Sequence, residues 1–177
     1  MNNFETDYAK TLNNFRTVIK DTNNHITTAF DSEYNCMGYA FGYYDWMDLD
    51  SFCCLDAYED EEYENGIEAE LEAMTLDCVQ EILKFGFRQI SQPHYAQAHE
   101  RVIAFRCGYD DFHFARLNSD GIWTHKPGGN FIREMTLDEL YGDAWCEHRI
   151  CPYISKVYFF AIDKDFDPYE FFDDLVK

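Results

Sequence analysis

The segment that most constrains the fold is residues 111–126, because two runs of strand character flank one compact turn. In residues 111–118, Phe112, Phe114 and Arg116 alternate with His113, Ala115 and Leu117, and residues 122–126 have the character of the returning strand after Asn118-Ser119-Asp120-Gly121. A period of two predicts a strand, and a short polar segment that contains glycine predicts the turn between two strands. We therefore expect an antiparallel β-hairpin here.

The register of this hairpin depends on the turn. If Gly121 takes the left-handed position of a three-residue loop, then His125 lies opposite Ala115. His113 and His125 are then diagonal neighbours on one face of the hairpin, within reach of a common site. A two-residue turn would place the two imidazoles on opposite faces, so the turn decides whether they can meet.

Cys36 opens a second informative segment. Apolar residues follow it at helical spacing, namely Met37, Ala40, Phe41 and Tyr44. This pattern predicts a short buried helix that begins at Cys36, in which Gly38 and Gly42 allow close packing against a neighbouring strand. A helix amino terminus and a nearby imidazole both lower the pKa of a thiol, which is about 8.5 when unperturbed. We therefore expect an activated thiolate at Cys36.

These residues together resemble the NlpC-type branch of the papain-like cysteine peptidases over residues 34–128. The resemblance lies in a cysteine at a helix start followed by the pattern His-x-x-x-x-x-x-x-Gly-x-x-x-His. Met37 stands where the family usually has serine. The stretch Trp123-Thr124-His125-Lys126-Pro127-Gly128 is also similar to uncharacterised bacterial and phage relatives.

The resemblance implies a Cys-His-His triad and a hydrolase that acts on a peptide or amide substrate by acyl transfer, without a cofactor. Cys36 would be the nucleophile, His113 the general base and His125 the residue that orients it. The backbone amide of Cys36 would help to hold the oxyanion. The implied fold is a single α+β domain, papain-like, with an antiparallel sheet packed against helices.

A structural interpretation of the same residues stays open. Cysteine is among the most buried residue types, and a chain with seven cysteines can place one on a helix by chance. A histidine on an alternating strand is often a core residue. A degenerate site, which keeps the fold and has lost the activity, is a further alternative.

The composition indicates a folded and strongly acidic protein. The chain has 34 acidic and 14 basic residues, which gives a formal net charge of −20 and disfavours direct binding to nucleic acid or to an anionic membrane. An apolar content of 46% and an aromatic content of 18% supply enough surface for a core. Residues 1–177 are most simply one domain.

Residues 56–72 form an acidic run, in which nine of seventeen residues are Asp or Glu. An apolar stripe in and after the run predicts a helix with a solvated acidic face that ends at Gly86; the stripe is Ile67, Leu71, Met74, Cys78, Val79 and Ile82. The alternative function is a catalytically inactive binding protein, of the kind phages use against host defence, which inhibits a nucleic-acid-binding enzyme by mimicking DNA or RNA charge. Its binding face would comprise Glu59, Asp60, Glu61, Glu62, Glu64 and Glu68.

The remaining signals concern the compartment. No apolar run approaches the roughly twenty residues of a membrane span, and the first residues do not resemble a secretion signal. The odd number of cysteines gives no disulfide framework, which suits a reducing compartment, so we expect a cytoplasmic protein. The spacing of Cys146, His148 and Cys151 matches no standard zinc motif, and we expect no metal site.

Other segments are predicted to build the scaffold. Residues 4–20 fit an amphipathic helix, and residues 101–107 and 153–162 have strand character. Thr136 and Glu139 suggest a capping box that opens a short helix, and Pro168 suits the first turn of a terminal helix.

Overall fold

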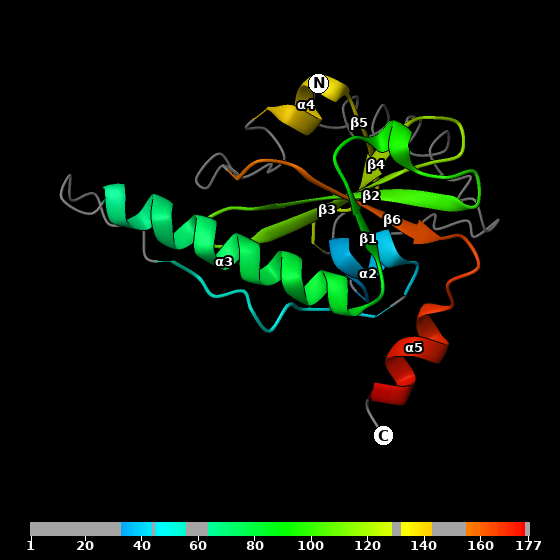
Figure 1. Cartoon of the computed structure of the whole chain (residues 1–177), viewed down its shortest axis with the longest axis horizontal. Helices are drawn as coiled ribbons and strands as arrows, with labels where there is room; N and C mark the ends of the chain where they lie inside the picture. Colours follow the sequence, from blue (N-terminus) through cyan, green and yellow to red (C-terminus); the bar gives the residue numbers. More distant parts are fainter. Residues whose placement is uncertain (1–32, 44, 56–63, 129–131, 143–154, 176–177) are drawn as a thin grey trace, which may run out of the picture.

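The structure is a computed structural model that describes residues 33–43, 45–55, 64–128, 132–142 and 155–175. Within these residues the fold is α+β, with one six-stranded antiparallel sheet and a few helices (Figure 1). None of the described helices combines the length and the apolar composition that crossing a membrane requires.

The strands are arranged in the order β1-β6-β2-β3-β4-β5. Their bounds are β1 (Arg88–Ile90), β2 (Glu100–Cys107), β3 (Phe112–Leu117), β4 (Trp123–His125), β5 (Arg133–Met135) and β6 (Tyr158–Asp163). The helices are α2 (Cys36–Phe41), α3 (Glu64–Lys84), the 3₁₀ turn η1 (Pro93–Tyr95), α4 (Leu137–Tyr141) and α5 (Pro168–Leu175).

The hairpin formed by β3 and β4 has the predicted three-residue register. Ala115 pairs with His125, and Gly121 has a φ of 83°, which is the left-handed conformation that the loop requires. The amide of Asn118 donates to the carbonyl of Ile122 at 2.9 Å and closes the loop. The two histidines therefore share one face of the sheet.

Each face of the sheet carries its own apolar cluster, because successive side chains of a strand point to opposite faces. Helices α2 and α3 pack on the face that presents Phe105, Phe114 and Phe160. The other face presents Ala115 and Trp123 and contacts Leu140 of α4. Figure 1 shows α3 and α4 on opposite sides of the sheet.

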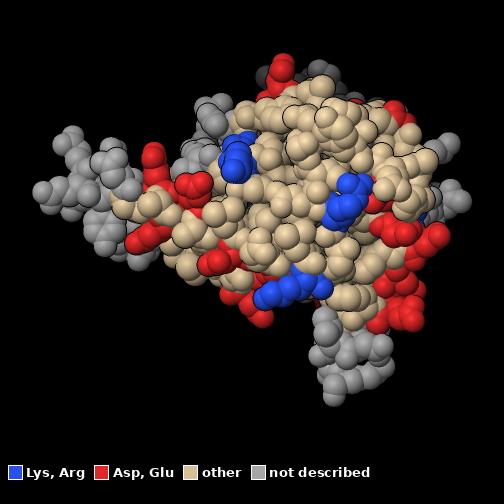
Figure 2. All heavy atoms as spheres, viewed as in Figure 1, with Lys and Arg blue, Asp and Glu red and all other residues tan. Residues whose placement is uncertain are grey.

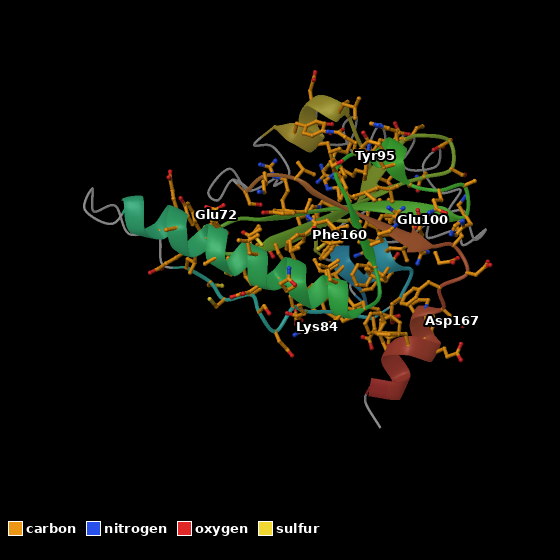
Figure 3. All side chains as sticks on the ribbon, in the orientation of Figure 1. Glu72, Lys84, Tyr95, Glu100, Phe160 and Asp167 are labelled. Carbon is orange, nitrogen blue, oxygen red and sulfur yellow. The ribbon has the colours of Figure 1, made fainter. Side chains whose placement is uncertain are left out.

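Helix α3 is amphipathic as predicted. All six residues of the predicted stripe are buried, and Phe160 of β6, labelled in Figure 3, belongs to the same apolar cluster as most of them. The carboxylate of Glu81 accepts the amides of Asp50 and Ser51 at 2.9 and 2.8 Å, so α3 also holds the loop that follows α2. After the helix, Gly86 adopts a φ of 82°.

Most of the other predictions for the scaffold are confirmed. Strand β2 covers the expected segment 101–107. In the expected segment 153–162, residues 153 and 154 lie outside the described residues, residues 155–157 are not strand, and β6 begins at Tyr158. The capping box of Thr136 and Glu139 opens α4, and Pro168 is the first residue of α5. Residues 4–20 lie outside the described residues. The short strands β1 and β5 were not anticipated.

Candidate functional site

Helix α2 begins at Cys36 because Asn35 caps it. The Asn35 side-chain oxygen accepts the backbone N–H of Gly38 at 3.1 Å, and its amide group donates to the carbonyl of Met47 at 2.5 Å. The helix has six residues and ends at Gly42, which has a φ of 79°. All six of its residues are buried.

Gly38 is required for a different contact from the one expected. A Cβ at this position would clash with the carbonyl oxygen of Asp45 and approach that of Tyr43 at 2.6 Å. The backbone that packs on Gly38 therefore belongs to the loop after α2 and not to a strand. Gly42 does face a strand residue, because a Cβ there would meet the Arg101 guanidinium of β2 at 3.4 Å.

A buried lysine fixes the chain just before Cys36. The Lys126 ammonium donates to the carbonyls of Tyr34 at 2.6 Å and Gly128 at 2.7 Å, and it lies 4.5 Å from the centre of the Tyr34 ring. Bonds from a charged donor to buried carbonyls are stronger than neutral ones. Lys126 thus holds residues on both sides of the site in one position.

Two arginines hold the other end of α2. Arg116 of β3 donates to the carbonyl of Tyr39 at 3.2 Å and lies over its ring, and Arg101 donates to the carbonyl of Phe41 at 2.5 Å. Cations at a helix carboxyl end complement the partial negative charge of its last carbonyls. Three basic side chains, Lys126, Arg116 and Arg101, therefore position the helix that begins at Cys36.

The Cys36 thiol is buried and protonated. Its side chain is 5% exposed, and its Sγ–H donates to the carbonyl of Phe112 on β3 at 3.8 Å. Burial, followed by the negative charge of Asp111, raises the pKa of this thiol to about 12. The expectation of an activated thiolate was wrong, because loss of hydration outweighs the effect of the helix amides.

The two histidines meet as predicted. His113 Nε2 and His125 Nδ1 are 2.9 Å apart, and the rings are perpendicular with an interplanar angle of 89°. Both side chains are buried, at 2% and 7% exposure. Burial first, and then neighbouring positive charge, holds the pKa of His113 well below 6.5 and lowers that of His125 to about 4.

The imidazole pair is part of a row of basic side chains across four strands. Arg106 of β2 pairs with His113 of β3, and Arg133 of β5 pairs with His125 of β4. The Arg106 guanidinium donates to the carbonyls of Ser155 at 2.8 Å and Gly142. Alternation along β2, β3 and β4 shows which residues of each strand share a face. The sequence does not show how β5 pairs with β4, so the position of Arg133 could not be predicted.

Cys36 and the imidazole pair approach β3 from different sides. His113 lies between Phe112 and Phe114, whose side chains face α2, so its own side chain lies on the opposite face. Strand β4 pairs only with residues 115–117 of β3. The Phe112 carbonyl that accepts the thiol therefore lies in the stretch of β3 beyond the end of β4, directly next to His113.

The acidic face predicted for the alternative function is only partly described. Glu59, Asp60, Glu61 and Glu62 lie outside the described residues, whereas Glu64 is the first residue of α3 and Glu68 is exposed. The exposed side of α3 continues with further acidic residues, which are Glu70, Glu72 and Asp77. Figure 2 shows acidic side chains around the rim of the molecule and few basic ones.

No group of three potential metal ligands occurs among the residues that the structure describes. The spaced residues Cys146, His148 and Cys151 lie outside that part of the chain.

Comparison with protein families identifies one match. A model of a domain of unknown function, DUF7689, matches residues 25–148, which include the α2 segment, the hairpin and the basic row. Searches among curated proteins and among solved structures find no similar chain.

Proposed function

The chain belongs to the DUF7689 family, and we propose that it is a cytoplasmic, papain-like cysteine hydrolase of the NlpC type that cleaves an amide bond by acyl transfer. The observation that carries the proposal is the His113–His125 hydrogen bond beside the Phe112 carbonyl that the Cys36 thiol contacts. The proposed nucleophile, base and orienting residue lie on α2, β3 and β4. The five described cysteines are all free, which suits a reducing compartment.

The proposed roles follow from which nitrogen of each imidazole carries the hydrogen. When the Nε2–H of His113 donates a hydrogen bond to His125 Nδ1, the Nδ1 of His113 carries no hydrogen and can accept a proton. His125 would then fix the tautomer of the base, which is the task of the third member of a triad. The depressed pKa of both imidazoles keeps them neutral at pH 7, so the base is in its active form.

The reaction starts from a neutral thiol and a neutral imidazole. Because Cys36 and the imidazoles lie on different sides of β3, the mechanism requires the thiol to leave the Phe112 carbonyl and to meet His113 in the stretch of β3 beyond the end of β4 as the substrate enters. His113 then takes the proton of the thiol while the sulfur attacks the amide carbon. The backbone N–H of Cys36 donates to the resulting oxyanion. His113 then protonates the departing amine, and the C–N bond breaks to leave a thioester on Cys36.

Water completes the cycle. His113 takes a proton from the water as its oxygen attacks the thioester carbon. The C–S bond breaks, the carboxylic acid leaves, and His113 returns the proton to the Cys36 sulfur. The proton transfer must accompany the attack, because a thiol with a pKa of about 12 is scarcely ionised at pH 7.

A small activated ester tests this mechanism without knowledge of the natural substrate. We expect p-nitrophenyl acetate to acetylate Cys36 at pH 7, with a burst of one p-nitrophenolate per chain, and the thioester to be located by mass spectrometry of peptides. The matched control replaces the two exposed thiols by Cys53→Ala and Cys54→Ala, and it should keep the burst. His113→Ala should lose it, and acetylation of Cys36 that persists in this variant would contradict the proposal.

A second function is favoured by the exposed side of α3, where Glu68, Glu70, Glu72 and Asp77 face solvent. In this alternative the chain is an acidic inhibitor of a nucleic-acid-binding enzyme, and its basic partner would be held by long-range attraction. Such binding should weaken steeply between about 50 and 200 mM salt. Changing the acidic residues to Gln should abolish inhibition and leave acylation of Cys36 unchanged, whereas Cys36→Ala should do the reverse.

A further inference from the structure

The basic row places two guanidinium groups across from the histidine pair. Arg133 stands directly across from His125 in the antiparallel pairing of β4 and β5, on the face that the imidazoles occupy. Arg106 stands across from His113, but its guanidinium is directed to the carbonyls of Ser155 and Gly142.

The charge matters because the pair can serve as a base only when it is uncharged. If His113 gains a proton, both of its nitrogens carry hydrogen and neither can accept another. If His125 gains the proton instead, its Nδ1 donates to His113 Nε2, which leaves the remaining hydrogen of His113 on Nδ1. In either case His113 has no nitrogen with which to take the proton of Cys36.

We propose that Arg133 is a positioning residue that keeps the His113–His125 pair uncharged and so preserves His113 as a base at mildly acidic pH. The catalytic importance of this effect rests on the proposed hydrolase function. The effect of Arg133 on the protonation of the pair can be measured without any enzymatic activity. Like charges at cross-strand positions are unfavourable, so protonation of His125 beside Arg133 is resisted.

The other charged groups near the pair do not cancel this effect. Among the described residues, the carboxylate that acts on His125 is that of Glu139 on α4, which raises the pKa of this imidazole less than Arg133 lowers it. The capping box fixes that carboxylate, since Glu139 accepts the backbone N–H of Thr136 at 2.6 Å. Of these two neighbouring charges, that of Arg133 therefore has the larger effect on the pKa of His125.

The test is a titration of the histidine Cε1–Hε1 signals by NMR in the full chain. Arg133→Gln should raise the pH at which the pair takes up a proton by about one unit or more, the usual effect of one neighbouring charge. Arg133→Lys keeps the charge and should titrate as the wild type does. Arg88→Gln is the matched control, because Arg88 lies on β1 in an exposed ion pair with Glu100. Glu139→Gln should move the titration in the opposite direction to Arg133→Gln.

Equal titration in the wild type and Arg133→Gln would overturn the inference. Arg133→Thr, which suits a strand, serves as a second neutral variant; if neither neutral variant folds while Arg133→Lys does, Arg133 is needed for folding and the electrostatic role is rejected. The acetylation assay separates this inference from the proposed function. At pH 5.5 the burst should fall in Arg133→Gln and persist in the wild type. If the titration moves as expected while the burst never depends on Cys36, the charge effect stands and the hydrolase proposal fails.

Discussion

Acid should destabilise this protein through the buried histidine pair. The pKa of His125 is about 4 in the folded chain, against 6.5 for an unperturbed histidine, and that of His113 is lowered in the same direction. Between these values the unfolded chain binds more protons than the folded chain, so stability falls as the pH falls. The contribution is fully present above pH 6.5 and is lost progressively down to about pH 4.

The size of the effect follows from the two pKa values of His125. Lowering the pH from 7 to 5 should cost about 2 kcal/mol of unfolding free energy from this residue alone, with a further loss from His113. Urea unfolding followed by tryptophan fluorescence at pH 5, 6 and 7 measures the loss. The many carboxylates also respond to acid, so the informative quantity is the difference between the wild type and His113→Gln/His125→Gln.

That difference should shrink or reverse toward pH 5, because the double variant cannot take up the two protons. A difference that stays constant between pH 5 and pH 7 would show that the imidazoles titrate normally in the folded chain. The two imidazoles would then not be held uncharged by burial and neighbouring charge.

Three further predictions concern Cys36 and the residues that hold its helix. Because the pKa of the Cys36 thiol is about 12, the rate of its alkylation by iodoacetamide should keep rising with pH to at least about pH 10. The rate for an ordinary cysteine peptide levels off above its pKa of about 8.5. A rate for Cys36 that levels off near neutral pH would indicate an activated thiolate. Lys126→Met removes two bonds to carbonyls and should lower the unfolding free energy by about 3 kcal/mol, since each bond from a charged donor contributes roughly 1.5–3 kcal/mol. Lys164→Met is the matched control, because Lys164 makes one exposed hydrogen bond to a carbonyl. The thermal unfolding midpoint of this variant should differ little from that of the wild type. Gly38→Ala should destabilise the chain or prevent folding because backbone oxygens occupy the space, whereas Gly66→Ala on α3 has open space and should stabilise it by up to about 1 kcal/mol; equal melting temperatures for the two variants would contradict the contact at Gly38.

The sequence by itself determined the local structure around the candidate site. The three-residue loop at Gly121, and with it the pairing of Ala115 with His125, could be worked out from turn chemistry because a hairpin joins residues close in the chain. The start of α2 at Cys36 and the apolar stripe of α3 followed from spacing for the same reason. The proximity of His113 to His125 was therefore predictable for a three-residue loop, and the structure has that loop rather than the two-residue turn.

Only the tertiary structure decided the electrostatics of the site. The pKa of the Cys36 thiol depends on burial and on Asp111, and burial arises when α2 packs on β3 across more than seventy residues of sequence. The positions of Arg133 and Lys126 depend on a third strand and on a loop that returns to Tyr34. Sequence periodicity carries no information on such contacts, since they are fixed by how the helices and strands pack together and by the cost of removing charge from water.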